Sequence, residues 1–360
     1  PHKVSRRQFL KASAAVVGST LLANQASAAP ARAPARARSK APARITYNYC
    51  DMCPWRCGVI VKTVDGKVTK IDGNPADPKS RGSLCARGQA GVSFLYDPDR
   101  LKQPMIRDGE RGSGKFRTVS WAEALDYTAQ QLDKIRKSDG PESVAFFGHT
   151  SGEFWFIDYF AQAFGSPNGS KPNMAICTSP REEAALITYG RGIGNHEPVD
   201  WDHTRCIVLI GTHIGEDARN TMMQDFANAR ARGAKVIVVD PRYSSAAMKA
   251  DYWLPIKPGT DTALLLAWIN VLITEGLYDR SYVSKYTEGF EQLAAHVRSF
   301  TPEWAAPITD LPAEQIRATA RAMGQSLPQA VIVPGRHVTW YGNDTQRMRA
   351  VYIINALLGA

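Results

Sequence analysis

Four of the six cysteines have the spacing of ligands to an inorganic group. Cys50, Cys53 and Cys57 lie within eight residues, and Cys85 follows after 27 intervening residues. Three closely spaced thiolates can bind one side of a 4Fe–4S cluster, and a distant fourth completes its set of cysteines. Structural zinc also takes four cysteines, but zinc ribbons usually pair two CxxC knuckles, and no second knuckle is present. A disulfide framework is disfavoured because the first three cysteines are so close together. The spacing predicts a cluster, with zinc as the alternative.

The two remaining cysteines differ in their surroundings. Cys177 lies in the loop 173–180, just before a helix expected to begin near Arg181. A helix N-terminus helps to keep a nearby thiolate ionised, although a buried cysteine is more often an inert apolar side chain. Cys206 begins an apolar run and is expected in the core. Cys206 is therefore expected to be structural, whereas the surroundings of Cys177 alone leave a reactive thiolate and an inert side chain both open.

The rest of the chain alternates between apolar strands and helical segments. A hairpin is predicted around the turn 64–66, and Ser120 with Glu123 forms a capping box at a helix start. Continuous apolar strands are buried on both faces, and helices between them indicate right-handed βαβ units on a parallel sheet. The predicted strands are 144–147, 206–210, 235–239 and 331–333. The fold class is therefore α/β.

The positive charge is concentrated at the start of the chain. The net charge is +10, but residues 1–44 carry nine basic and no acidic residues, so the remainder is nearly neutral. This distribution removes the main argument for nucleic-acid binding. Arg6 and Arg7 precede a short, weakly apolar run and the cleavage motif 26–28, which is typical of a twin-arginine signal peptide. An amphipathic first helix is the alternative. We expect a periplasmic protein exported after folding.

The length of 360 residues indicates two or three domains. No run of 18 or more apolar residues is present, so no membrane-spanning helix is expected. The lack of an initiator Met and the abrupt end suggest a longer natural chain. The predicted segments are a signal peptide 1–28, a Pro/Ala/Arg linker 29–44, a 4Fe–4S domain 45–105, a first α/β segment 106–172, an inserted Rossmann-like domain 173–335 and a return to the earlier α/β domain in 336–360.

The residues around the cysteines resemble a known family. The segments 49–58 (YCDMCPWRCG) and 84–88 (LCARG) are similar to the cluster-binding amino terminus of the dimethyl-sulfoxide-reductase family of molybdopterin oxidoreductases. The resemblance implies a 4Fe–4S cluster and a bis-molybdopterin guanine dinucleotide that carries molybdenum or tungsten. It also implies that Arg87 lies between cluster and pterin in electron transfer, and that Cys177 ligates molybdenum. Without the resemblance, Arg87 would be read as an ordinary surface arginine.

Three loops are expected to bind the dinucleotide, because ligands of open α/β sheets bind beyond the carboxyl ends of the strands. Aspartates there can accept hydrogen bonds from ribose or guanine, while an arginine and backbone amides face pyrophosphate. Ordinary helix capping is the alternative for each loop. No G-x-G-x-x-G motif is present, which disfavours a nicotinamide dehydrogenase. The predicted binding residues are Gly211, Thr212, His213, Asp240, Pro241, Arg242, Gly259, Thr260 and Asp261.

Two further positions resemble the polysulfide/thiosulfate reductase type within this family. Arg336 would offer a permanent cation to an anionic substrate, and His149 could donate a proton near neutral pH. His337 and Arg347 are expected to be structural. The resemblance implies a catalytic subunit that reduces polysulfide or thiosulfate, together with a ferredoxin-like iron–sulfur subunit and a quinone-reactive membrane subunit. The alternatives are an arsenate, tetrathionate or formate enzyme on the same scaffold, or an electron-transfer subunit without an active metal.

Overall fold

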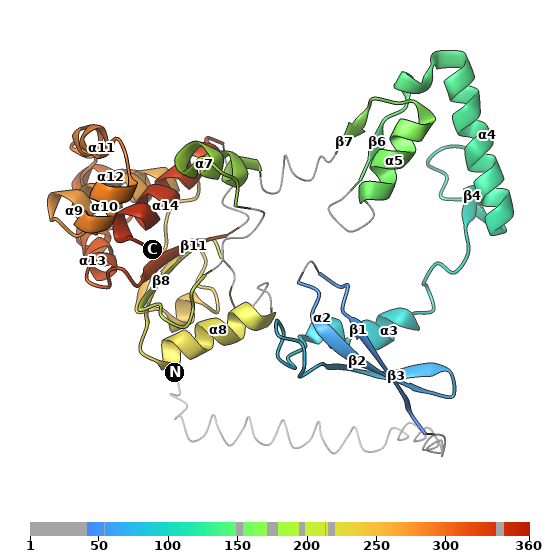
Figure 1. The fold of residues 1–360 in the computed structure, drawn as a ribbon, viewed down its shortest axis with the longest axis horizontal. Helices are drawn as coiled ribbons and strands as arrows, with labels where there is room; N and C mark the ends of the chain where they lie inside the picture. Colours follow the sequence, from blue (N-terminus) through green and yellow to red (C-terminus); the bar gives the residue numbers. More distant parts are fainter. Residues whose placement is uncertain are drawn as a thin grey trace, which may run out of the picture. The chain divides into compact units, whose positions relative to one another are not determined.

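The computed structural model describes residues 42–53, 55–148, 154–170, 179–193, 199–212, 214, 220–335 and 342–360 (Figure 1). The first strands are β1 (Arg44–Tyr49), β2 (Gly58–Val64) and β3 (Lys67–Gly73), which form one sheet in the order β1-β2-β3. Asp65 and Gly66 both have positive φ, of 50° and 71°, as a two-residue hairpin turn requires. The predicted hairpin is confirmed. Residues 42–46 and 61–70 form a small unit, and the other described residues form a second.

A mixed segment follows. It contains α2 (Ala86–Gln89), α3 (Gly91–Leu95), the antiparallel pair β4 (Met105–Arg107) and β5 (Phe116–Thr118), α4 (Trp121–Asp139), the 3₁₀ turn η1 (Pro141–Ser143), β6 (Phe146–Phe147), α5 (Phe154–Phe164) and β7 (Gly169–Ser170). Ser120 caps α4, since its Oγ accepts the Glu123 N–H at 3.2 Å. The side chain of Glu123 pairs with Arg117 at 2.8 Å. The strand expected over 144–147 is shorter, because only β6 finds a partner, in β7.

The main sheet contains four parallel strands in the order β10-β9-β8-β11. Their bounds are β8 (Cys206–Ile210), β9 (Lys235–Val239), β10 (Tyr252–Leu254) and β11 (Ala330–Pro334). The prediction of a parallel α/β fold after a small cysteine-bearing region is confirmed. β10 was not predicted, because three residues are too few to show a strand pattern.

Each face of this sheet packs into a different core. Val208 and Ile210 face a core that includes helix α9, whereas Ile207 and Leu209 face a second core that includes α8. This alternation follows from the two-residue period of a strand. Cys206 is fully buried in the first core, as predicted, and burial raises the pKa of its thiol to about 12. The helices are α7 (Ser179–Tyr189), α8 (Asn220–Ala231), α9 (Asp261–Thr274), α10 (Arg280–Tyr286), α11 (Phe290–Val297), α12 (Pro302–Thr309), α13 (Ala313–Gly324) and α14 (Asp344–Leu358), with the 3₁₀ turn η2 (Ala247–Lys249).

Helix α14 belongs to the first core. It packs against α7, α9 and β11, and Met348, Val351 and Leu358 are buried in the same cluster as the central helix α9. Residues 336–360 were expected to return to the earlier segment 106–172. In the described part of that range, α14 makes its main contacts with elements of the segment predicted as 173–335. The domain boundaries stay predictions. None of the helices in the described part of the chain combines the length and the apolar character that a membrane span requires.

Candidate functional site

The four cysteines predicted to bind a cluster are free thiols on two neighbouring loops. The Cys50 N–H donates to the Cys57 carbonyl at 2.8 Å, which closes the loop carrying the first three. Burial raises the pKa of Cys57, and Cys53, Cys50 and Cys85 raise it further, which places all four within electrostatic reach. An added Cβ on Gly88 would lie 3.3 Å from Cys50 Sγ, so the Cys85 loop adjoins the first loop. The set fits a 4Fe–4S cluster, which takes four thiolates.

Among the residues that the structure describes, no three or more His, Cys, Asp or Glu side chains form a site for a single metal ion. A cluster contains several iron atoms, and its thiolates bind different ones.

Cys85 is the N-cap of α2, and its environment favours the thiolate. Burial alone raises the pKa of Cys85, but hydrogen bonds from the Gly88 and Arg87 amides and from the Arg87 guanidinium outweigh it and lower the pKa. The side chain of Arg87 is therefore directed at a cluster-binding sulfur, and the residue is exposed. This position suits the predicted role of Arg87 in electron transfer, which remains a prediction.

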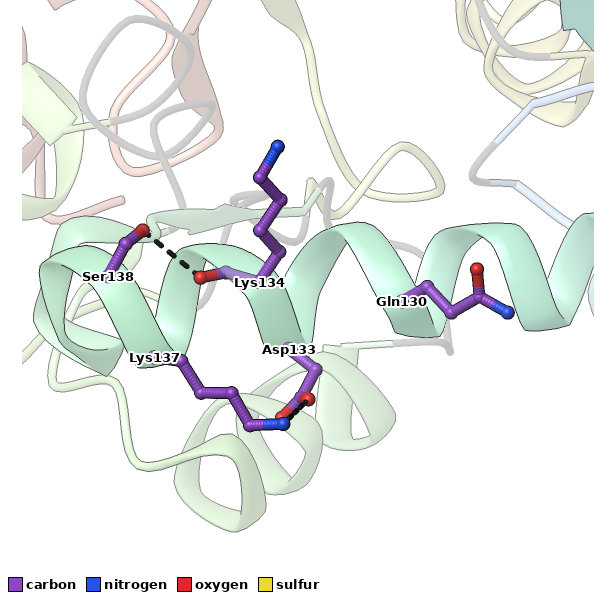
Figure 2. A pocket seen from close by; sticks show the side chains of 5 residues that line it. All are labelled: Gln130, Asp133, Lys134, Lys137 and Ser138. Carbon is purple, nitrogen blue, oxygen red and sulfur yellow. Dashed lines mark hydrogen bonds and ion pairs between the residues drawn. The ribbon is translucent and has the colours of Figure 1, made fainter.

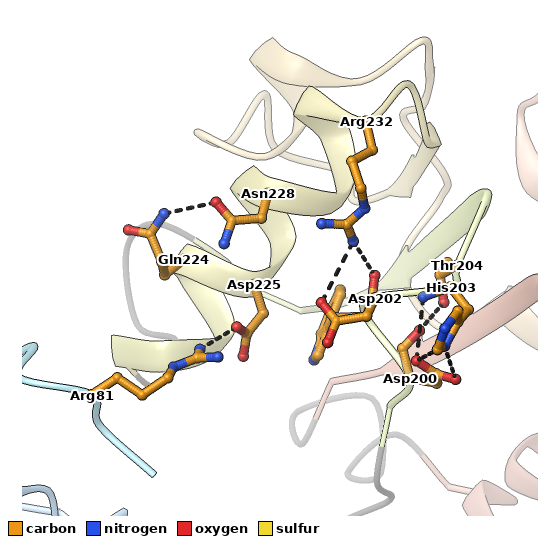
Figure 3. Close-up of polar contacts among 10 residues, drawn as sticks. Arg81, Asp200, Asp202, His203, Thr204, Gln224, Asp225, Asn228 and Arg232 are labelled. Carbon is orange, nitrogen blue, oxygen red and sulfur yellow. Dashed lines mark hydrogen bonds and ion pairs between the residues drawn. The ribbon is translucent and has the colours of Figure 1, made fainter. Parts of the chain in front are cut away.

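Arg81, four residues before Cys85, makes a contact that the sequence did not indicate. Its guanidinium pairs with Asp225 of α8 (Figure 3). Just beyond the other end of α8, Arg232 donates to the Trp201 carbonyl at 2.7 Å. The loop that carries the fourth cysteine thus contacts a helix packed on the main sheet.

The loops predicted to bind the dinucleotide follow β8, β9 and β10, so they share the carboxyl edge of the parallel sheet. The strand order places the topological switch between β8 and β11, where open α/β sheets bind ligands. At this point Gly211 and Gly335 approach closely, since a Cβ on Gly335 would lie 1.8 Å from the Gly211 carbonyl oxygen. The Thr212 hydroxyl donates to the Val333 carbonyl at 2.9 Å. The loop after β8 is therefore fixed to the end of β11.

Asp240 organises the loop after β9. Its side chain is buried, and its Oδ1 accepts the Arg242 N–H at 2.9 Å in an Asx turn. The Trp253 indole donates to the Asp240 carbonyl at 2.8 Å. Pro241 and Arg242 are exposed at the tip of this loop. The geometry gives Asp240 a positioning role and presents Arg242 to solvent, as an anion-binding residue requires.

Asp261 is buried and paired at the start of α9. It is the first residue of α9 and 8% exposed, and its carboxylate lies 3.4 Å from the guanidinium of buried Arg347. Arg347 also pairs with Asp344 at 2.6 Å. Burial raises the pKa of Asp261, and Arg347 opposes that effect. The carboxylate expected to accept hydrogen bonds from ribose or guanine is thus paired inside the protein, and Arg347 has the structural role expected of it.

The other two residues of this loop precede α9. Gly259 has a φ of +83°, and an added Cβ would meet open space. Glycine therefore suits this position because of its backbone conformation and not because of close packing. The Thr260 hydroxyl donates to the Lys257 carbonyl at 2.6 Å.

Several predicted site residues lie outside the described residues, namely His149, Cys177, His213, Arg336 and His337, together with the signal segment 1–28. A shallow hollow occurs on α4, where Lys137 pairs with Asp133 at 2.6 Å (Figure 2). None of the predicted site residues lines this hollow.

Comparison with family models assigns most of the chain. Residues 100–360 match the model "Molybdopterin oxidoreductase", and residues 43–97 match "Molybdopterin oxidoreductase Fe4S4 domain". Residues 3–23 match the "TAT (twin-arginine translocation) pathway signal sequence". The chain therefore carries a twin-arginine signal.

Similar proteins span more than this chain does. The thiosulfate reductase molybdopterin-containing subunit PhsA of Salmonella typhimurium is 36% identical, over 99% of this chain and 46% of its own length. Dimethyl sulfoxide reductase DmsA of Escherichia coli is 30% identical, over 99% and 49%. The solved structure of acetylene hydratase from Pelobacter acetylenicus superposes with a TM-score of 0.72 at 30% identity, covering 87% of this chain and 43% of that one. The chain thus spans about half the length of these relatives.

The matches agree with the cysteine geometry and with the parallel sheet. They assign a 4Fe–4S cluster and a molybdopterin cofactor with molybdenum to this protein, in agreement with the sequence prediction. By its sequence and its fold, the chain belongs to the molybdopterin oxidoreductase family.

Proposed function

We propose that the chain is part of the catalytic subunit of a periplasmic reductase for a sulfur compound such as polysulfide or thiosulfate. The observation that carries the proposal is the 36% identity with a thiosulfate reductase subunit over 99% of the chain. The relatives named for dimethyl sulfoxide reduction are 30–32% identical. The residues His149 and Arg336, which resemble the polysulfide/thiosulfate type, support the same substrate class.

Each residue has a distinct part in this proposal. When bound, the molybdenum centre supplies two-electron chemistry, with Cys177 as its protein ligand. Arg87, which hydrogen-bonds to the cluster cysteine Cys85, would place a fixed positive charge beside the cluster and favour its reduced state. Arg336 holds the anionic substrate and His149 supplies a proton. For thiosulfate, two electrons and two protons cleave the S–S bond and yield sulfite and hydrogen sulfide.

The dinucleotide would lie along the carboxyl edge of the main sheet. Arg242 is exposed at the loop after β9, and the loops at Gly211 and Gly259 bring backbone amides to the same edge. In this arrangement Arg242 faces pyrophosphate, while Asp240 and Asp261 hold the loops rather than the ligand.

The decisive experiment measures the substrate range of the full-length enzyme. Oxidation of reduced viologen is followed with polysulfide, thiosulfate, tetrathionate and arsenate, and formate is tested in the reverse direction. We expect the first two to be preferred. Arg336→Ala should lower kcat/KM by an amount that corresponds to a loss of about 2–4 kcal/mol of transition-state stabilisation. His149→Ala should slow turnover roughly 10²-fold or more. The exposed Arg298 provides a matched control, as Arg298→Ala. Faster turnover of arsenate or formate than of any sulfur compound would refute the substrate assignment.

The location and the partners form a second part of the proposal. The signal sequence supports export to the periplasm, and by family resemblance the protein would work with a ferredoxin-like iron–sulfur subunit and a quinone-reactive membrane subunit. Replacing both Arg6 and Arg7 by Lys should leave cofactor-loaded protein in the cytoplasm, measured by fractionation. Normal export of that variant would show that another route reads the signal.

A further inference from the structure

The turn between β3 and α2 is organised by one carboxylate oxygen. Asp77 Oδ2 accepts the Gly58 N–H at 3.0 Å and the Ser80 N–H at 2.8 Å, and it also accepts the Ser80 hydroxyl. Ser80 is fully buried. One oxygen therefore binds three donors from two separate segments of the chain.

Both segments carry cluster cysteines. Gly58 directly follows Cys57, and a Cβ added to Gly58 would lie 2.7 Å from the Asp77 Cβ, so glycine is required for this close approach. Ser80 precedes Cys85 by five residues, and its carbonyl accepts the Ser83 N–H at 2.8 Å. Asp77 thus connects the end of the first cysteine loop to the start of the second.

Backbone hydrogen bonds reinforce the same connection. The Asn74 N–H donates to the Gly58 carbonyl at 2.9 Å, and the Asn74 carbonyl accepts the Gly82 N–H at 3.0 Å. The side chain of Asp77 closes the centre of this arrangement, and its loss would leave the buried Ser80 and the Gly58 amide without their acceptor. Donors left unsatisfied in this way cost more than the hydrogen bond itself contributes.

The carboxylate also brings a fixed negative charge to the cysteines. The Ser80 hydroxyl and the Gly58 amide lower the pKa of Asp77 to about 2, so the side chain is ionised throughout the physiological range. Asp77 Oδ2 lies 3.0 Å from the amide nitrogen of Gly58, the residue after Cys57, so its charge lies beside a cluster cysteine. A nearby anion disfavours the addition of an electron, and net charge and hydrogen bonding are established determinants of cluster potential.

We propose that Asp77 is a positioning residue of the 4Fe–4S cluster, which fixes Cys57 relative to Cys85 and lowers the reduction potential of the cluster through its charge. The inference rests on the cluster and not on the proposed substrate, so a failure of one leaves the other intact.

Two substitutions separate geometry from charge. Asp77→Asn keeps an oxygen acceptor and removes the charge, so the variant should retain its iron while the cluster potential becomes more positive. Asp77→Ala removes the acceptor, and the cluster should be lost to an iron chelator on the order of tenfold faster than from wild type. Asp65→Asn, in the β2–β3 turn, removes the same charge at a residue whose φ of 50° suits asparagine and should behave as wild type.

The measurements are made on the full-length protein without substrate. They are iron and sulfide per chain, the paramagnetic signal of the reduced cluster, its potential by redox titration, and the rate of iron release. An unchanged potential in Asp77→Asn, or the same positive shift in Asp65→Asn, would overturn the electrostatic role. Iron release from Asp77→Ala at the wild-type rate would overturn the positioning role. If Asp77→Ala does not fold, Ser80→Ala, which removes one of the three donors, replaces it and should still release iron faster.

Discussion

The guanidinium of Arg347 in α14 lies 3.4 Å from the carboxylate of Asp261, the first residue of α9, and both side chains are buried. Asp344, the first residue of α14, binds the same guanidinium at 2.6 Å. Arg347 therefore links the N-terminal ends of two helices, and it neutralises acidic groups at both. Because Asp261 ends the predicted dinucleotide loop 259–261 and begins α9, this ion pair also holds the end of that loop.

Removal of Arg347 should be strongly destabilising. Arg347→Ala would leave two buried carboxylates without their cation, a change that typically costs about 3–5 kcal/mol. Chemical denaturation followed by circular dichroism measures the loss. The exposed Arg298 serves as the control, and Arg298→Ala should change stability by less than about 0.5 kcal/mol. Equal effects of the two substitutions would show that the buried pairs are not needed for stability.

Tyr352 should make the stability of the protein depend on alkaline pH. Its side chain is buried against α7, and burial raises the pKa of its phenol to about 12, from the ordinary value of 10.0. Between these values the unfolded chain loses the proton and the folded chain keeps it, so stability falls as pH rises from about 10 to 12. Tyr352→Phe should reduce that fall, as measured by urea unfolding at each pH. Tyr286→Phe, at an exposed position, should not, and an unchanged slope in Tyr352→Phe would contradict the prediction.

The ion pair between Arg81 and Asp225 should respond to a charge swap. The two side chains are 55% and 21% exposed, so the pair is worth only about 0.5–1 kcal/mol. Arg81→Glu should increase hydrogen exchange in residues 74–85 through repulsion, and adding Asp225→Arg should restore protection. Arg81 has a φ of 50°, which glutamate tolerates no better than arginine, so strain is matched between them. A double variant no better protected than Arg81→Glu alone would show that the pair does not hold the loop.

Substitutions of Cys85 and of Cys206 should have different effects on the cluster. Cys85→Ser should lower iron per chain and abolish the reduced-cluster signal, because the fourth thiolate is lost. Cys206→Ala should leave both unchanged and cost about 1 kcal/mol, since it deletes one buried atom from the core of the main sheet. Elemental analysis and paramagnetic resonance of the two variants make the comparison. Iron loss in Cys206→Ala alone would reverse the assignment.

The features predicted most accurately from the sequence are those that depend on a local pattern of residues. β8 and β9 have the predicted bounds, because each is a short run of apolar residues buried on both faces. The cysteine spacing is also local, and it indicated the cluster. β10 escaped prediction because its three residues show no period, and it is recognised only by its pairing with β9.

Contacts between distant residues could not be predicted in the same way. An aspartate at a helix start can cap the helix, bind a ligand or form an ion pair, and Asp261 pairs with an arginine 86 positions away. Asp77 carried a visible signal, the Asp-Pro-Lys-Ser turn, but its bond to Gly58 depends on the fold. The packing of α14 against α7 and α9 likewise joins residues that are far apart in the sequence, so no local pattern indicated it.

The pairing of β11 with β8 has a consequence for the order of events during synthesis. Ala330 pairs with Cys206, so the edge between Gly211 and Gly335 cannot close until the ribosome has produced the chain through β11. Contacts between residues so far apart form late, since a long stretch of chain must be ordered first. In nascent chains shorter than this, β11 is missing, so β9 is the one neighbour of β8 in the described sheet that can already pair with it. A cofactor that needs the completed edge must therefore be inserted after translation of this region, and a route that exports folded proteins leaves time for that step.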